Sequence, residues 1–186
     1  MSELDLLVVR RGTDPAGETC AHALRDLLGA PVAGVERGEL WRFEVAPAAS
    51  GDPAAVRIAV ERAAMRAGRY VNSNRDTCRW IAGAVPYPAD APPLGVAVDV
   101  WVCDGDGRDA AALAYFRAQA GDVVRGVRRG TWWRLWMQEG PADAARERAW
   151  DLACTRSRTH GLLFNPQAQN AEILAVVPGP GIKEIR

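Results

Sequence analysis

The side chains that could do chemistry are few and scattered along this 186-residue chain. Its histidines and cysteines are His22, His160, Cys20, Cys78, Cys103 and Cys154. None of them falls into a C-x-x-C or H-E-x-x-H spacing, so the spacing predicts neither a zinc site nor a redox dithiol. The sequence also lacks a P-loop and a G-x-S-x-G nucleophile turn. We therefore expect no catalytic residue, no metal and no cofactor.

Composition places the chain among globular proteins. Apolar residues make up 48% and charged residues 25% of the sequence, and the formal net charge is zero. A neutral chain has no overall field that would attract nucleic acid or an anionic membrane. No apolar run approaches the roughly 20 residues that span a bilayer, and the N-terminus lacks the pattern of a signal peptide. We expect a cytoplasmic protein with no nucleic acid and no membrane partner.

An internal repeat is the strongest pattern in the sequence. The stretch "ERGELWRF" (36–43) returns 92 positions later as "RRGTWWRL" (128–135). An ungapped alignment of 6–45 with 98–137 gives eleven identities in forty positions. A stretch with four prolines separates the copies, and proline favours extended linkers. The domains we expect are a first repeat (1–83), a linker (84–95), a second repeat (96–177) and a tail (178–186).

Each repeat predicts the same order of elements, βαββαβ. In the first repeat, periodicity predicts strands near 4–11, 31–38, 39–46 and 76–85, and helices near 14–28 and 52–68. In the second it predicts strands near 96–103, 122–129, 131–138 and 170–177, and helices near 107–120 and 141–158. A tight turn is expected near Gly38. Two such units would be ferredoxin-like sandwiches of the α+β class, with helices on one sheet face.

The first helix of each repeat should begin at an aspartate. Asp14 suits the N-cap because its carboxylate can accept from the first free amides, and Pro15 suits the next position. Asp106 stands 92 positions after Asp14 and is expected to be the second N-cap. Gly29 and Gly121 suit the helix ends.

Strand alternation separates two faces of each sheet. Trp41, Phe43 and Val45, with their counterparts in the second repeat, suit the face that packs on helices. The opposite face carries our interface candidates, which are Leu40, Arg42, Trp101, Trp132, Arg134 and Trp136. Tryptophans on an uncovered face would form an apolar patch of the kind that marks interfaces. Two interpretations stay open: the repeats cover each other there, or an external partner docks.

These patterns resemble PurS, the small subunit of bacterial phosphoribosylformylglycinamidine synthase. The resemblance rests on the D-P-x-G turn at the first helix, the Arg-Gly hairpin and an Asn-Pro step. The positions that carry it are Pro15, Gly17, Arg37, Gly38, Arg129, Gly130, Asn165 and Pro166. The second repeat departs from the pattern with Asp106-Gly107, and the first departs from it with Asn72-Ser73.

The resemblance implies a fused pseudo-dimer of PurS-like units with no catalysis of its own. Such a subunit bridges a PurL-like synthetase and a PurQ-like glutaminase in de novo purine biosynthesis, so that ammonia passes between them. Two alternatives remain, a scaffold for a specialised amidating enzyme and a tandem ACT-like module that senses a small ligand. Further homo-oligomerisation is also open.

Overall fold

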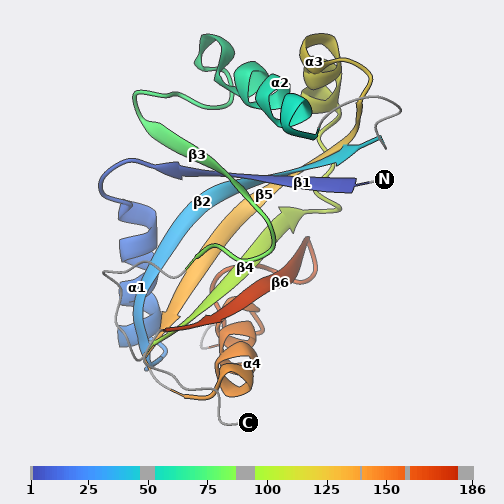
Figure 1. Ribbon diagram of the computed structural model, residues 1–186. Coiled ribbons are helices and arrows are strands. Elements are labelled where there is room, and N and C mark those ends of the chain that lie inside the picture. The colour runs from blue at the N-terminus through green and yellow to red at the C-terminus, as the bar shows by residue number, and fades with distance from the viewer. Residues whose placement is uncertain (1, 47–52, 87–94, 139, 158–159, 180–186) are drawn as a thin grey trace. The chain divides into compact units, whose positions relative to one another are not determined.

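The computed structural model describes residues 2–46, 53–86, 95–138, 140–157 and 160–179 (Figure 1). These residues form a mixed α+β fold with a six-stranded antiparallel sheet in the order β3-β1-β2-β5-β4-β6. The strands are β1 (Ser2–Arg10), β2 (Val32–Val45), β3 (Asp76–Ile81), β4 (Val96–Asp104), β5 (Val124–Met137) and β6 (Gln169–Pro178). The helices are α1 (Pro15–Asp26), α2 (Pro53–Met65), α3 (Ala110–Ala120) and α4 (Ala142–Ala153), with a short 3-10 turn η1 (Arg66–Gly68).

The tight turn expected near Gly38 is wrong, because β2 and β5 each run unbroken through their Arg-Gly step. Each repeat is therefore βαβαβ. Gly38 pairs with Val9 on β1 and does not adopt the positive φ of a tight hairpin turn. A Cβ there would stand 2.7 Å from the Val8 carbonyl oxygen and 2.8 Å from the Val9 side chain. The glycine permits a close approach of two strands. From sequence alone, this role cannot be told from that of a glycine in a turn.

The long strands pass from one compact unit to another. Unit 1 comprises Met1–Thr13, Gly38–Ala82 and Asp106–Gly130, and unit 2 comprises Asp14–Arg37, Gly83–Gly105 and Thr131–Arg186. The boundaries cut β2 after Arg37 and β5 after Gly130. The units therefore do not coincide with the two sequence repeats. Unit 1 consists mainly of the first repeat but includes α3 and the first part of β5 from the second repeat. Unit 2 consists mainly of the second repeat but includes α1 and the first part of β2 from the first repeat.

Unit 1 has its own hydrophobic core. Trp41, Phe43 and Val45 of β2 pack against α2 and α3, as alternation predicts. Phe116 of α3 lies at the centre, with its ring centroid 6.1 Å from that of Trp41 and 4.9 Å from that of Phe43. The Tyr115 hydroxyl donates to the Ala63 carbonyl at 2.9 Å and ties α3 to α2. The helix that completes the core of the first repeat's strands is thus supplied by the second repeat.

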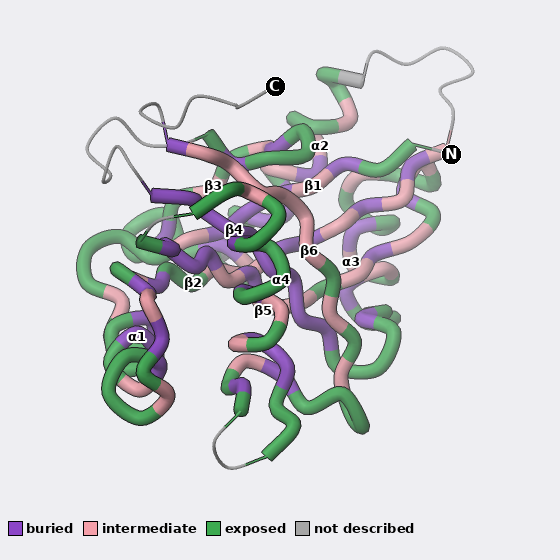
Figure 2. The backbone as a smooth tube through the Cα atoms, turned by 90° about the horizontal axis from the view of Figure 1, so that it is seen from below, coloured by how far each residue is buried: buried purple, intermediate pink, exposed green. Residues whose placement is uncertain are grey.

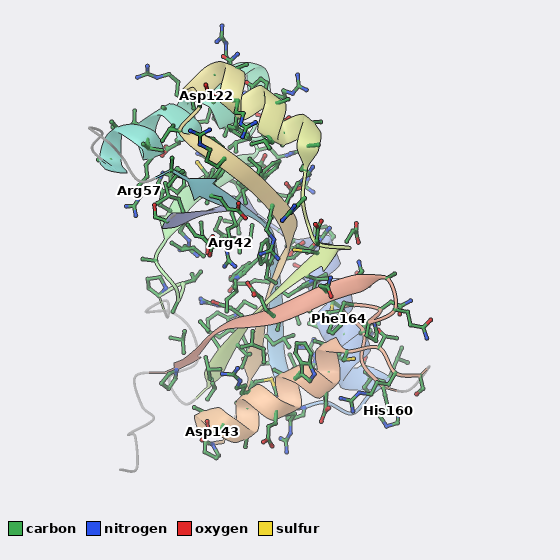
Figure 3. The ribbon with its side chains drawn as sticks, turned by 90° about the vertical axis from the view of Figure 1, so that its right-hand side faces the viewer. Arg42, Arg57, Asp122, Asp143, His160 and Phe164 are labelled. Atoms are coloured by element: carbon green, nitrogen blue, oxygen red, sulfur yellow. The ribbon has the colours of Figure 1, made fainter. Side chains whose placement is uncertain are left out.

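Unit 2 is built the same way with the roles reversed. Leu135 and Met137 of β5 pack against Leu24 of α1 and the alanines of α4. In β4, every residue except the last is buried (Figure 2), and the buried run is apolar except for Asp99. Phe164, labelled in Figure 3, closes the core beside Trp150 of α4, with ring centroids 5.4 Å apart.

The aspartate predicted to cap the second repeat's first helix is the wrong one. The N-cap of α3 is Asp109, whose carboxylate accepts from the Ala112 amide at 2.8 Å. Asp106 lies in the preceding turn, where it accepts from the Arg108 amide at 3.0 Å. The loop before α3 is longer than the loop before α1, which an ungapped alignment cannot show. Asp14 does stand at the N-cap of α1, but its side chain makes no capping bond.

The predicted glycine end is confirmed for α3, whose C-cap is Gly121, whereas α1 ends earlier, at Asp26 with Leu27 as its C-cap, and Gly29 lies in the turn beyond it. Gly29 has φ of 60° and Gly121 has φ of 87°, values that favour glycine. Most of the predicted linker (87–94) and tail (180–186) lies outside the described residues. Among the helices that are described, none has the length and apolar character needed to cross a membrane.

Candidate functional site: the Arg-Gly-Trp-Arg strands

The Arg-Gly-x-x-Trp-Arg motif, which occurs at 37–42 and 129–134, makes reciprocal contacts between the repeats. In unit 2, the Arg37 guanidinium of the first repeat lies 5.5 Å from the ring centroid of Trp133 in the second. In unit 1, Arg129 of the second repeat lies 4.7 Å from the ring centroid of Trp41 in the first. Each repeat thus supplies the cation for the other repeat's indole. These reciprocal contacts give a physical reason why the motif occurs in both repeats.

Arg129 also forms an ion pair. One of its terminal nitrogens donates to both carboxylate oxygens of Glu39, at 2.9 and 3.0 Å. Both partners of this ion pair are close to half exposed, so solvent weakens it. The position equivalent to Glu39 in the second repeat is Thr131.

Two matched glycines bring the long strands close together. Gly34 faces Trp136, whose ring carbon would lie 3.4 Å from a Cβ at that position. Gly126, 92 residues later, faces the Glu44 side chain. The Trp136 indole donates to Glu36 at 2.9 Å. A Cβ at Gly126 would stand 2.7 Å from the Glu44 carboxyl carbon and would displace that side chain, whereas a Cβ at Gly34 would make only ordinary contact with Trp136.

The most buried charges of the described chain form a cross-strand pair in unit 2. Arg134 of β5 and Asp99 of β4 face each other and are each 1% exposed. Two parallel hydrogen bonds join them, at 2.7 Å from Nε and 2.9 Å from a terminal nitrogen. The Val85 and Pro86 carbonyls accept at 2.6 and 3.2 Å. The guanidinium therefore has partners for most of its donors, as a buried charge requires.

Aromatic rings complete this site. The guanidinium carbon of Arg134 lies 5.4 Å from the Trp132 centroid and 5.3 Å from the Trp136 centroid. Because most of its donors are already used and both rings contact it, Arg134 has little capacity for a ligand. The arrangement holds β4, β5 and the segment at Val85 together.

Unit 1 contains the counterpart of this pair. Arg42 of β2, labelled in Figure 3, donates to Asp5 of β1 through two bonds of 2.9 Å, and Glu3 lies 3.5 Å from it. The side chains of Arg42 and Asp5 are 12% and 14% exposed. The chemistry matches that of Arg134 and Asp99, but in unit 1 the pair reaches water.

The sequence could have revealed these aspartates with one further step. Arg42 and Arg134 are 92 positions apart, whereas Asp5 and Asp99 are 94 apart. The ungapped alignment set Leu7 opposite Asp99. A two-residue gap matches "LDLLVV" (4–9) with "VDVWVC" (98–103) and places the acids together.

The interface candidates are largely buried inside the single chain. Trp132 and Leu40 are fully buried, Trp101 and Arg134 are 1% exposed, and Trp136 is 7% exposed. The indole N–H of Trp132 finds no acceptor in the part of the chain that the structure describes. The face therefore does not present the exposed tryptophan patch that would dock an external partner. A role for these residues in joining the repeats stays a prediction.

Nucleophilic and metal-binding groups do not gather. Burial raises the pKa of Cys20 to about 11, with a smaller contribution from Asp14, and burial likewise raises the pKa of Cys78. Thiols with raised pKa values stay protonated at neutral pH and are poor nucleophiles. His22 pairs with Asp26 on α1 at 2.9 Å, and the His160 ring contacts the Ser157 hydroxyl at 3.0 Å. Over the described ranges, no three His, Cys, Asp or Glu residues are placed to hold a metal.

The remaining motif positions have structural roles. Pro15 is the first residue of α1, and Gly17 faces β2, where a Cβ would lie 2.7 Å from the Val35 carbonyl oxygen. Asn165 starts the turn into β6, and its side chain accepts from the Gln167 amide at 3.0 Å. Asn72 makes the same turn before β3, accepting from the Asn74 amide at 3.1 Å. Pro166 is exposed.

An open groove on the outer side of α2 was not predicted. Ile58 and Met65 lie in it, 57% and 37% exposed, with Arg62 and Arg66 also lining it. Gln119 of α3 also lines it and hydrogen-bonds to Arg66. The corresponding helix of unit 2, α4, exposes no large apolar residue. The spacing of Ile58 and Met65, two helical turns apart, could have marked this apolar stripe.

Comparisons with protein-family models, with curated proteins and with solved structures give no match to this chain.

Proposed function

We propose that this chain is a PurS-like, non-catalytic scaffold whose repeats form a fused pseudo-dimer. It bridges a PurL-like synthetase and a PurQ-like glutaminase of phosphoribosylformylglycinamidine synthase in purine biosynthesis. The observation that carries the proposal is the exchange of α1 and α3 between the repeats, with the reciprocal Arg–Trp contacts. Such an exchange is the arrangement of a dimer, here with both protomers on one chain. A covalent link raises the effective concentration of the halves to the millimolar range.

The content of each unit supports the ferredoxin-like part of this proposal. Unit 1 gathers four strand segments, from β3, β1, β2 and β5, with the two helices α2 and α3. Unit 2 gathers the same number of parts. Four strands and two helices are the parts of a ferredoxin-like sandwich. In this proposal each sandwich is completed by the other repeat.

The α2 groove supplies a surface for the larger partners. Apolar side chains in a helix-lined groove, bordered by arginines, suit the docking of a partner's helix or strand. The described helix α4 exposes no large apolar residue, so in this proposal the two repeats serve different partners. A scaffold that joins two unlike enzymes needs such a difference.

Reconstitution with the PurL-like and PurQ-like proteins of the same organism tests the function. We expect a stable complex, and a glutamine-dependent amidation that falls when this chain is omitted while amidation with free ammonia persists. Glutamine-dependent activity that is unchanged without the chain, with no complex formed, would refute the proposal.

A matched pair of variants tests the docking surface. Ile58→Glu should weaken the complex at least tenfold, because it places a charge in the apolar groove. Leu27→Glu is the control, since Leu27 is 78% exposed at the end of α1 and lies outside the groove. Equal affinities for the two variants would exclude the groove as the docking site.

Proteolytic cleavage between residues 89 and 90 tests the fused pseudo-dimer separately. The fragments should stay associated, because each unit contains segments of both. Two folded monomers at micromolar concentration would contradict it.

A further inference from the structure

The strand β6 is one of two edges of the sheet (Figure 1). It pairs with β4 from Val96↔Pro178 to Asp104↔Gln169, and no strand of the described residues pairs with its other side. An edge strand presents a row of backbone donors and acceptors to any strand that approaches. Because β6 and β4 both belong to unit 2, this edge is a property of that unit alone.

The two edges of the sheet differ in length and charge. The edge strand β3 has six residues and carries Asp76 and Arg79. The edge strand β6 has ten residues, and five in a row, from Ile173 to Val177, are apolar. Short length and charge protect an edge from pairing, and β6 lacks both over this stretch.

The apolar stretch of β6 is also accessible. Residues 173–178 are all partly exposed, as the continuous intermediate colouring of β6 in Figure 2 shows. One side of the strand packs on the unit 2 core through Ile173 and Val176, so the edge is held in place. The ladder with β4 contains one extra residue, Leu174, between Ile173 and Ala175. Ordered but partly exposed apolar strands of this kind favour addition of another strand.

We propose that β6 pairs in antiparallel fashion with β6 of a second copy of this chain, about a two-fold axis. A two-fold axis sets identical strands antiparallel and makes the same patch meet itself. In such a pairing the residue at the axis faces its own copy, and every other residue of 173–177 faces another residue of the same uncharged stretch, so no like charges meet. The chain's zero net charge adds no long-range repulsion between copies. The stretch offers no charge that would select an unlike strand, so the second copy is the occupant that the chemistry favours.

The proposed self-pairing predicts a dimer in solution. It also predicts that one charged side chain introduced on β6 prevents the dimer from forming. We expect light scattering of the intact chain to give the dimer mass at high concentration. Val177→Lys should give a monomer that keeps the far-UV circular dichroism of the unaltered chain, because the lysine ammonium stays hydrated only when the edge is unpaired. Thr77→Lys is the matched control on the exposed β3 edge and should leave the dimer intact.

Amide hydrogen exchange supplies a second measurement. The amides of residues 173–177 should exchange more slowly as the protein concentration rises, while those of β3 should not change. A monomer at every concentration would overturn the proposal, as would a dimer that survives Val177→Lys. Protection of β6 that appears only when a PurL-like or PurQ-like protein is added would also overturn it, in favour of an unlike strand.

Discussion

The same arginine–aspartate pair occurs in both units, in two different environments. In unit 2, Arg134 and Asp99 are each 1% exposed and lie between tryptophan rings. In unit 1, Arg42 and Asp5 keep more than a tenth of their side-chain surface in water, with Glu3 nearby. Both pairs have two-bond geometry within 0.2 Å of each other. The hydrogen-bond distances therefore do not distinguish the two pairs, whereas the exposed fractions of their side chains do.

This comparison shows how the repeats diverged without losing their shared plan. A charge that is removed from water depends almost wholly on its partner, whereas a partly exposed charge can fall back on solvent. Unit 2 surrounds its pair with Trp132, Trp136 and the Val85 and Pro86 carbonyls, and unit 1 has Leu40 and Glu44 at the positions of the two tryptophans. The ion pair is fully buried in unit 2 and partly exposed to solvent in unit 1.

The largest predicted effect is the loss of one buried carboxylate. Asp99→Asn should destabilise the chain by about 3–5 kcal/mol, because Arg134 would be left buried without a counter-charge. Asp5→Asn should cost only about 1 kcal/mol, since Arg42 can use Glu3 and water. Urea denaturation midpoints of the two variants measure the difference. Equal losses of unfolding free energy in the two variants would mean that burial does not determine how much the ion pair contributes to stability.

Replacing both members of the buried pair should cost less than replacing one. Asp99→Leu with Arg134→Met removes the desolvation cost along with the attraction, so the double variant should be more stable than Asp99→Asn by about 1 kcal/mol or more. Thermal and urea unfolding of the unaltered chain, Asp99→Asn, the double variant and its two single variants measure this difference. A double variant as unstable as the sum of its single variants would show that the Arg134 bonds to Val85 and Pro86 carry the stability.

The helix caps give a comparison of intermediate size. Asp109→Ala should cost about 1 kcal/mol, because the Ala112 amide loses its acceptor. Asp106→Ala and Asp14→Ala should each cost less, since neither carboxylate caps its helix. If Asp106→Ala proved the most costly of the three, the assignment of Asp109 as the N-cap would be wrong.

The smallest predicted effect tests the reciprocal contacts directly. A double-mutant cycle of Arg37→Ala with Trp133→Ala should give a coupling of about 0.5 kcal/mol, typical of a cation–π contact at the surface. The cycle of Arg37→Ala with Trp41→Ala, its neighbour within the same repeat, should give none. Coupling within a repeat in place of coupling between repeats would contradict the exchange.

Element types were predictable from sequence because periodicity and caps are local. The α+β class, the helix near 14–28 and the core face of Trp41 and Phe43 are all confirmed. Local pattern failed at Gly38, where a strand crossing and a hairpin turn both call for glycine. The choice between them depends on whether the next strand segment pairs with its own repeat or the other, and no local signal carries that information. The insertion before α3, which moved the cap to Asp109, was hidden for a similar reason.

The site was partly predictable in the same sense. Arg42, Arg134 and the tryptophans stood out because they recur at a fixed offset, and alternation placed them on one face. Their partners Asp5 and Asp99 were missed because that offset changes by two within the first strands. The burial of Trp101 and Trp132 follows from how the whole chain packs, which residue spacing does not determine.

The exchanged helices also set an order in which this protein can form during translation. Phe43 leaves the ribosome 73 residues before Phe116, the ring that it packs against in unit 1. At synthesis rates of about 5–20 residues per second, that interval is roughly 4–15 seconds. Throughout it, Trp41 and Phe43 have no α3 to cover them. The nascent first repeat should therefore be a chaperone client until the second repeat is well under way, and a stop codon after the linker would release an aggregation-prone fragment, not a small folded domain.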